Sequence, residues 1–246
     1  MKPDPPGVAL VIPTLNEAAT LPRLARLLAA LDPAPAEILV VDGGSTDGTA
    51  ALARELGLPV IEHGEAGRSR QINRGVAHVA GPYVCVLHAD TLPPDDMIAV
   101  IRATLADPRV ALAGFTPLLS GPAKVRWVTS FHNWIKTWYA PIIMRPHLFL
   151  RGVRLLFGDH AMFFRREQFL AAGGCDPGMS VMEEADLCVK MARFGRIRLV
   201  NRIILTSDRR VAAWGEWRAN WIYFTVGIRW AFGLHKRLGD RYPHIR

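Results

Sequence analysis

Two carboxylates stand at the ends of short apolar runs in this chain of 246 residues. Residues 38–41 lead into Asp42, and residues 84–87 lead through His88 to Asp90. Each run is typical of a buried parallel strand, and parallel strands bring their carboxyl ends to one crevice where ligands bind. A carboxylate there can hold Mg²⁺ or Mn²⁺ while the cation bridges a diphosphate. The pattern therefore predicts a polar crevice for a nucleotide and a divalent cation.

A glycine-rich loop, residues 43–49, follows the first of these acids. Its backbone amides could approach a nucleotide, with Asp42 accepting a hydrogen bond from a base N–H. Ser45, Thr46 and Asp47 are also good N-cap residues, so the same letters fit an ordinary capped turn between a strand and a helix. Both interpretations stay open from this segment alone.

Residues 67–75 open a helix with cations and amides, among them Arg68, Gln71 and Asn73. Such groups suit the recognition of a phosphate or a sugar. A charged helix start that faces solvent accounts for the same residues, so this segment is a weaker indication than the two strand ends.

Three acids, Glu183, Glu184 and Asp186, cluster at the start of a later predicted helix. The helix dipole favours acids at this position, which is enough for a purely structural role. Alternatively, one of them is a general base that takes a proton from a hydroxyl within hydrogen-bond reach. The glycines between residues 173 and 178 would let the preceding loop close over a substrate.

Alternating strands and helices must position these groups. We expect strands at residues 8–12, 37–41, 60–61, 83–87 and 110–115, and helices at 24–31, 49–56, 71–79 and 95–105. This order predicts an α/β fold with a mostly parallel central sheet flanked by helices. Beyond it we expect a strand at 157–165, a helix at 183–194, a strand at 197–205 and an aromatic, basic helix at 214–236.

Composition limits the class of protein. Hydrophobic residues make up 50% of the chain, yet no uninterrupted apolar run reaches the length of a membrane span. The first residues lack the apolar segment of a secretory signal, so we expect a cytoplasmic protein. The three cysteines have no paired or zinc-site spacing and are interpreted as reduced core thiols. The formal net charge of +8 allows phosphorylated, lipid or nucleic-acid partners.

An aromatic and basic region follows the alternating part of the chain. Residues 108–158 contain no Asp or Glu, while Trp127, Phe131, Trp134 and Trp138 recur at helical spacing among Lys and Arg. Such helices settle at anionic bilayer surfaces, at the inner face of the membrane in a cytoplasmic protein, or they form a lid on the core. A nucleic-acid partner is not expected, because the aromatics lie on predicted helices and not on an exposed sheet.

Four motifs in order, residues 11–17, 41–49, 87–91 and 182–187, resemble those of the family-2 inverting glycosyltransferases of GT-A fold. The likeness runs from about residue 8 to about residue 210, and the metal motif resembles that of a small bacterial branch that reads His-Ala-Asp. The resemblance implies a GT-A domain over residues 1–210, with a nucleotide-binding half at about 8–115 and an acceptor half at about 116–210. A helical extension, aromatic and basic, would occupy residues 211–246.

The resemblance also implies a mechanism. A sugar would pass with inversion from a UDP- or GDP-linked donor to an acceptor hydroxyl, lipid-linked or close to a membrane, with Mn²⁺ or Mg²⁺ at Asp90 and a base among Glu183, Glu184 and Asp186. With the residues singled out above, the expected substrate-binding set is Pro13, Thr14, Asn16, Glu17, Asp42, Gly43, Gly44, Arg68, Gln71, Asn73, His88, Ala89, Asp159, Arg209 and Arg210. Arg209 and Arg210 fit surface cations equally well.

Three positions depart from the family pattern. Gly43 stands where many members carry a second acid, His88 replaces the first acid of the usual metal pair, and Glu184 stands where the base is generally Asp. The departures at His88 and Glu184 support a second hypothesis, a non-catalytic protein of the same fold that binds a sugar nucleotide or a membrane surface. A dehydrogenase is disfavoured, because the loop after the first strand lacks the Gly-x-Gly-x-x-Gly turn.

Overall fold

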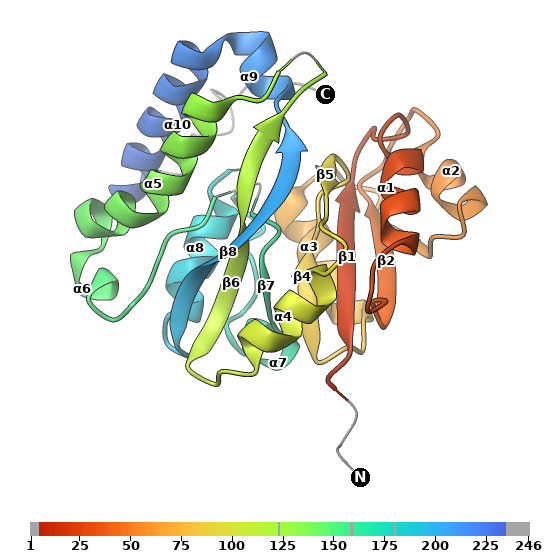
Figure 1. Ribbon diagram of the computed structural model, residues 1–246, viewed down its shortest axis with the longest axis horizontal. Coiled ribbons are helices and arrows are strands. Elements are labelled where there is room, and N and C mark those ends of the chain that lie inside the picture. The colour runs from red at the N-terminus through yellow and green to blue at the C-terminus, as the bar shows by residue number, and fades with distance from the viewer. Residues whose placement is uncertain (1–4, 123, 158–159, 180, 235–246) are drawn as a thin grey trace.

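The computed structural model describes residues 5–122, 124–157, 160–179 and 181–234 (Figure 1). Within them, one sheet of eight strands has the order β3-β2-β1-β4-β7-β6-β8-β5. The strands are β1 (Val8–Thr14), β2 (Glu37–Asp42), β3 (Val60–Glu62), β4 (Tyr83–Val86), β5 (Thr91–Leu92), β6 (Val110–Ser120), β7 (Phe163–Arg165) and β8 (Arg196–Ser207).

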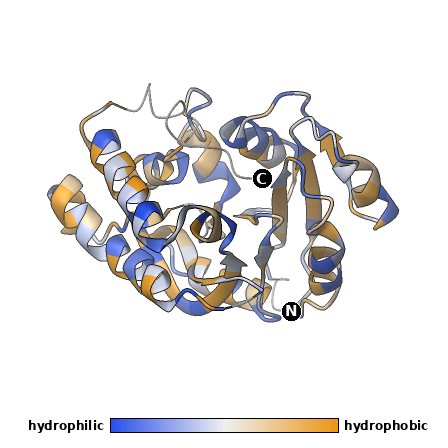
Figure 2. Ribbon diagram, turned by 90° about the horizontal axis from the view of Figure 1, so that it is seen from above, coloured by the Kyte–Doolittle hydropathy of each residue, from blue (hydrophilic) through white to orange (hydrophobic). Residues whose placement is uncertain are grey.

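Helices cover both faces of this sheet (Figure 1). They are α1 (Leu21–Ala29), α2 (Thr49–Glu55), α3 (Arg68–His78), α4 (Met97–Leu105), α5 (Trp127–Met144), α6 (Pro146–Phe149), α7 (Arg166–Ala171), α8 (Glu183–Met191), α9 (Arg209–Trp214) and α10 (Glu216–Ala231). Figure 2 shows strands coloured mostly as hydrophobic, while the helices around them alternate hydrophobic and hydrophilic residues. This is the patterning of a sheet that is buried between two helical layers.

The strand β1 illustrates how the sheet divides the core. Leu10 and Ile12 belong to the cluster formed with α1, α2 and α4, whereas Ala9 and Val11 belong to the cluster formed with α3, α7 and α8. Alternate side chains of a strand point to opposite faces, so both faces of β1 are apolar. The α/β fold expected from the sequence is confirmed.

The strands β3, β2, β1 and β4 form a parallel part of the sheet. The strand β1 pairs in parallel with β2 and β4, and β2 pairs in parallel with β3. The strands β6 and β8 are also parallel, while β7 is antiparallel to β4 and β6, and β5 is antiparallel to β8. The register places Thr14 opposite Asp42, so the carboxyl ends of β1 and β2 lie at the same edge.

Several elements differ from the sequence-based expectation. The strand β6 continues past the expected 110–115 to Ser120. The strand expected at 157–165 is shorter, Phe163–Arg165, because Ala161 has a positive φ of +40°, which interrupts the extended backbone. The helix expected at 214–236 is α10, which begins only after Gly215, where φ is +81°, and a separate helix, α9, precedes that glycine. Residues 235 and 236 lie outside the described part of the chain.

The close packing of α3 on the sheet depends on Gly75. A Cβ at this position would lie 2.3 Å from Val11 Cγ1 and 3.0 Å from Val41 Cγ2, and both valines are fully buried. We expect Gly75→Ala to lower the free energy of unfolding by about 1–3 kcal/mol, although alanine is the better helix former, because overpacking a tight core outweighs helix propensity. Urea unfolding measures this change. The neighbouring Arg74→Ala, at an exposed position, is the control and should stay within about 0.5 kcal/mol of the parent; equal losses in both variants would contradict the packing argument.

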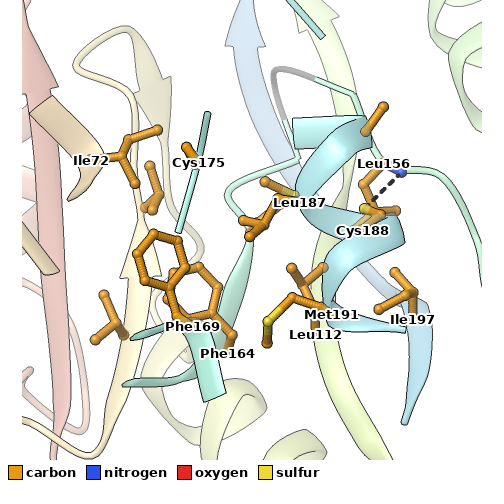
Figure 3. Close-up of a cluster of buried hydrophobic side chains, with 14 of the residues drawn as sticks. Ile72, Leu112, Leu156, Phe164, Phe169, Cys175, Leu187, Cys188, Met191 and Ile197 are labelled. Carbon is orange, nitrogen blue, oxygen red and sulfur yellow. Dashed lines mark hydrogen bonds between the residues drawn. The ribbon is translucent and has the colours of Figure 1, made fainter. Parts of the chain in front are cut away.

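The helix α8 is anchored by the cluster drawn in Figure 3. Its Leu187, Cys188 and Met191 are fully buried, and the Leu156 N–H donates to Cys188 Sγ at 3.4 Å. Burial raises the pKa of the Cys188 thiol to about 12, so this thiol stays protonated at neutral pH. All three cysteines are free and buried, which confirms the expected core thiols. Because the body of α8 is fixed in the core, the acids at its first turn have a defined position.

Candidate active site at the strand ends

The carboxylate of Asp42 organises the loop that follows β2. Asp42 is 2% exposed, and its oxygens accept hydrogen bonds from the backbone N–H groups of Gly44 (3.0 Å) and Ser45 (2.8 Å). Thr14 Oγ1 and Ser45 Oγ also donate to it. At the end of the loop, the Thr49 N–H donates to Asp47 at 3.0 Å. The loop is thus a hydrogen-bonded turn, although the N-cap of α2 is Gly48 and not one of the three expected residues, and a ligand here would meet a turn that is already rigid.

A second loop, after β1, is tied to the first. Asn16 adopts a positive φ of +56°, its N–H donates to Ser45 Oγ at 2.8 Å, and its Oδ1 accepts from the Thr46 N–H at 2.9 Å. The Glu17 N–H donates to Thr49 Oγ1 at 2.8 Å. Because neither segment can move without breaking these bonds, the loops form one floor beside the strand ends.

Gln71, on α3, holds the two strands together beneath this floor. Its Nε2 donates to the carbonyl oxygens of Thr14 (2.7 Å) and Val41 (2.8 Å), and the side chain is 3% exposed. A Cβ on Gly43 would lie 2.9 Å from Gln71 Cδ and Nε2. The structure therefore gives a steric reason for glycine at residue 43, where many members of the resembling family carry an acid.

The glycine-rich loop before α8 is held by α3. Asn73 Nδ2 donates to the Cys175 carbonyl and the Cys175 N–H donates to Asn73 Oδ1, both at 2.8 Å. Ser69 Oγ donates to the Met179 carbonyl at 3.1 Å. The side chains of Gln71 and Asn73, both predicted to bind substrate, thus form hydrogen bonds within the protein. Nothing in the sequence pointed to Ser69.

Arg68 meets two of the three predicted acids. The helix α8 begins at Glu183, and Arg68 Nη1 lies 2.9 Å from Glu184 Oε1 and 3.2 Å from Glu183 Oε1. Glu183 is 0% exposed and Glu184 4% exposed. Asp186 instead pairs with Lys190 Nζ at 3.0 Å, an i,i+4 pair that the spacing could have indicated. Glu183 and Glu184 are therefore a buried carboxylate pair, and Asp186 has its own partner.

The environment gives the two buried carboxylates different proton affinities. Burial, together with the neighbouring charge of Glu184, raises the pKa of Glu183 to about 7. Burial also acts to raise the pKa of Glu184, but the charges of Arg68 and His88 outweigh it, so this pKa lies below its ordinary value. Pairs of acids that are driven apart in this way suit different roles in proton transfer. Glu184 is the one that is ionised throughout the neutral range.

The raised pKa of Glu183 predicts how stability depends on pH. A carboxyl whose pKa is higher in the folded state stabilises the fold below its ordinary pKa, and this contribution is lost as the pH rises through about 7. We expect Glu183→Gln to raise the free energy of unfolding by about 2 kcal/mol at a pH of about 8, and to change it little near pH 4. Urea unfolding across this range measures the effect, with Glu167→Gln, at an exposed position, as the control. A constant difference at every pH would contradict the assignment.

Asp90 lies in a cation-binding arrangement with Glu17. Arg209 Nη2 is 2.8 Å from Asp90 Oδ2 and 2.8 Å from Glu17 Oε1, so one guanidinium is shared by both carboxylates. Burial acts to lower the pKa of Arg209, but hydrogen bonding to Glu17 and the charge of Asp90 raise it well above its ordinary value. The side chain of Asp90 is 23% exposed, so it remains accessible to a ligand.

Charge interactions join the Asp90 arrangement to the buried acid pair. The charge of His88, just after β4, helps to lower the pKa of Glu184, and that of Arg210, next to Arg209 on α9, acts against the raised pKa of Glu183. The structure thus brings together the starts of α3, α8 and α9 and the end of β4. Ala89 is buried at 3% exposure and belongs to the core, as Pro13 belongs to the β1–β2 ladder. Asp159 lies outside the described residues.

A divalent cation fits Asp90 on the chemistry of the donors. In the described residues, no three or more His, Cys, Asp and Glu side chains are grouped so that they could hold a metal ion. Mg²⁺ in phosphate-binding sites, however, commonly uses one or two carboxylates, with the remaining ligands from water and phosphate oxygens. Glu17 and Asp90 already share one positive charge, so these oxygens are suited to a cation that a diphosphate helps to hold.

Comparisons with known proteins agree with this geometry. Residues 9–172 match the family described as Glycosyl transferase family 2. The succinoglycan biosynthesis protein ExoA of Rhizobium meliloti is 31% identical over 198 residues, which cover 76% of this chain and 58% of ExoA. The chain therefore spans little more than half the length of that relative.

Two solved structures share the architecture. The mannosyltransferase PcManGT from Pyrobaculum calidifontis, in complex with GDP-Man and Mn²⁺, has a TM-score of 0.69 at 20% identity, covering 98% of this chain and 66% of that one. The glucosyl-3-phosphoglycerate synthase from Mycobacterium tuberculosis, in complex with Mn²⁺, UDP and glucosyl-3-phosphoglycerate, has a TM-score of 0.63 at 18% identity, covering 93% of this chain and 80% of that one.

Proposed function

This chain belongs to glycosyl transferase family 2 and has the GT-A fold, and from that premise we propose that it moves a sugar from a nucleoside-diphosphate donor to an acceptor hydroxyl with inversion. The observations that support this proposal are the buried pair Glu183–Glu184, which Arg68 contacts, and the carboxylate of Asp90, which Arg209 contacts. In this proposal the first supplies a base and the second a diphosphate site, the two groups that sugar transfer from such a donor requires.

The donor would occupy the floor made by the loops after β1 and β2. Thr14 and Asp42 are paired at the ends of β1 and β2, and Asp90 and Glu17 share Arg209, which opens α9. The proposed substrate-binding residues would contact the donor. Gln71 and Asn73 would act indirectly, because their side chains hold the loops around the donor in place. The two similar solved structures contain GDP-Man and UDP, so donors with a guanine and donors with a uracil base should both be tested.

Asp90, with Glu17 beside it, would hold the divalent cation. A cation bound there neutralises negative charge on the diphosphate, which makes this group a better leaving group. Arg209 would then exchange the two carboxylates for phosphate oxygens, since a guanidinium binds either group through the same N–H donors. Arg210, next along α9, adds a second positive charge on the same side.

Glu184 would act as the base. Its carboxylate takes the proton of the acceptor hydroxyl, the hydroxyl oxygen forms a bond to the anomeric carbon, and the bond from that carbon to the diphosphate breaks with its electron pair on the leaving oxygen. Because attack comes from the face opposite the leaving group, the configuration inverts. Because the pKa of Glu183 is raised to about 7, Glu183 would keep the pair from carrying two full negative charges.

The proposal is tested by incubating the protein with UDP- and GDP-linked sugars and Mn²⁺, while following release of the nucleoside diphosphate and the anomeric configuration of the product. We expect release with at least one donor, and an inverted product once an acceptor alcohol is supplied. The absence of both turnover and nucleoside-diphosphate binding with every donor would overturn the proposal. Binding without turnover, retained in Asp90→Ala, would favour the non-catalytic alternative.

A further inference from the structure

The helix α5 has its polar and apolar sides reversed. The side chains that it buries are small or polar, including Thr129, Asn133 and Thr137, and Ser130 Oγ accepts the Leu119 N–H at 2.9 Å. The side that faces outward carries Trp127 (67% exposed) and Phe131 (61% exposed). The interpretation of these aromatics as a core lid is therefore wrong for this part of α5. An ordinary surface helix buries its apolar side. The exposed apolar side of α5 therefore indicates a binding surface.

The helix α10 extends the same apolar surface. It packs against α5, where His132 of α5 lies 3.1 Å from Asn220 Oδ1 and a Cβ on Gly227 would lie 3.4 Å from Met144 Cε. Its Trp217 and Trp221 are 91% and 66% exposed at i,i+4 spacing, so they lie on one side of the helix. We call the combined surface the aromatic face; its principal residues are Trp127, Phe131, Trp134, Trp138, Trp217 and Trp221.

The charges around the aromatic face have one predominant sign. Residues 124–157 contain Lys and Arg but no acid, and within α9 and α10 the acid is Glu216. Glu216 is already paired, with Arg126 at 3.2 Å and Lys124 at 3.8 Å. The side chains of Lys124, Arg151 and Arg218 are exposed. A partner that covers this surface therefore has to be apolar within and negatively charged around it.

We propose that the aromatic face docks on the surface of a lipid bilayer that contains anionic headgroups. Trp is suited to the bilayer interface, and basic side chains around it add attraction to anionic lipid. Arg154 lies over the rings of Trp138 and Phe149, at 4.4 and 4.5 Å from the centroids, so its charge is held beside the apolar surface. A second copy of the chain fits poorly, because two such surfaces would oppose like charges.

The docking would be interfacial and close to the crevice. In the part of the chain that the structure describes, no helix is long and apolar enough to cross a bilayer. The helix α9 begins at Arg209, which contacts Asp90, and only Gly215 separates α9 from α10 (Figure 1). The segment α9–α10, which carries Trp217 and Trp221, thus starts at the proposed diphosphate site. A docked molecule would present its crevice near the lipid surface, and the docking itself does not depend on sugar transfer.

Co-sedimentation with vesicles tests the proposal. We expect the full chain to bind vesicles of phosphatidylcholine with about one third phosphatidylglycerol at least about tenfold better than phosphatidylcholine alone. The triple variant Trp127→Gln, Phe131→Gln and Trp217→Gln should lose this binding. The matched control is Leu170→Gln with Ile203→Gln, two residues that are also exposed (44% and 53%) but lie outside the aromatic face, and it should bind as the parent does.

A second measurement is independent of whether the variants fold. Tryptophan fluorescence of the parent protein should shift to shorter wavelength on anionic vesicles and be quenched by brominated lipid, because the indole rings enter the interface. Absence of binding, equal binding to both kinds of vesicle, or equal losses in the triple variant and the control would overturn the proposal. A dimer in sedimentation velocity that the triple variant abolishes, without vesicle binding, would overturn it in favour of an interface between copies.

Discussion

Glu184→Gln is expected to lower kcat for sugar transfer by about 10²–10⁴, the range that a general base contributes. The amide keeps the size of the side chain and its contact with Arg68, but it cannot take the proton of the acceptor hydroxyl. The pKa of Glu184 lies below its ordinary value, so the parent enzyme has this base ionised throughout the neutral range. Initial rates with saturating donor, compared with nucleoside-diphosphate binding by calorimetry, separate loss of chemistry from loss of affinity.

Glu183→Gln and Asp186→Asn are the matched controls for this loss. Glu183 is 0% exposed against 4% for Glu184, so its carboxylate is less accessible to an acceptor hydroxyl, and Asp186 pairs with Lys190 at 3.0 Å. Both variants should keep kcat within about tenfold of the parent, since they leave the base in place. The opposite pattern, a large loss in Glu183→Gln with little loss in Glu184→Gln, would transfer the role of base to Glu183.

Asp90→Asn should have the second largest effect, a loss of about 10²-fold or more in kcat/KM together with loss of the dependence on Mn²⁺. The amide has one neutral oxygen in place of a carboxylate, so it binds a hard cation and the diphosphate beside it poorly. Titrating the rate with Mn²⁺, and measuring nucleoside-diphosphate binding with and without the cation, gives the effect on each. Asp90→Asn should bind the nucleoside diphosphate equally well with and without Mn²⁺.

The control for this measurement is Asp96→Asn. Asp96 also pairs with an arginine, Arg202 at 2.8 Å, but both side chains are nearly half exposed and the pair contacts none of the site residues named above. It should leave the Mn²⁺ dependence unchanged, because an exposed ion pair contributes little. If Asp90→Asn keeps the Mn²⁺ response of the parent, the cation is not held at Asp90.

The sequence predicted the parts of the site that follow from strand and helix periodicity. Runs of apolar residues that end in Asp42 and Asp90 identified two strand ends, and the parallel order of an α/β sheet places such ends at one edge. The start of α8 at Glu183 was also predicted, because acids favour the first turn of a helix. These features are local, and the topology needs few assumptions to bring them together.

The sequence pattern could not predict the contacts that long side chains make across the fold. Arg209 reaches Asp90 across 119 positions of the chain, and Arg68 reaches Glu184 across 116. The orientation of α5 was equally hidden. The spacing of Trp127 and Phe131 places them on one side of a helix, but the rule that apolar sides face inward predicts the opposite orientation to the one observed. The burial of small and polar side chains, with Ser130 bonded to β6, sets which side of α5 faces the protein.

The close approach of Gly43 to Gln71 means that residue 43 can carry a side chain only if residue 71 changes as well. Gln71 fills the space that a side chain at residue 43 would need, and its amide bonds the carbonyl oxygens of Thr14 and Val41. Grafting the second acid of other family members onto residue 43 therefore requires a shorter residue at 71 and another donor for the two carbonyls. A protein engineer who adds a side chain at residue 43 alone would displace Gln71 and break its hydrogen bonds to the carbonyl oxygens of Thr14 and Val41.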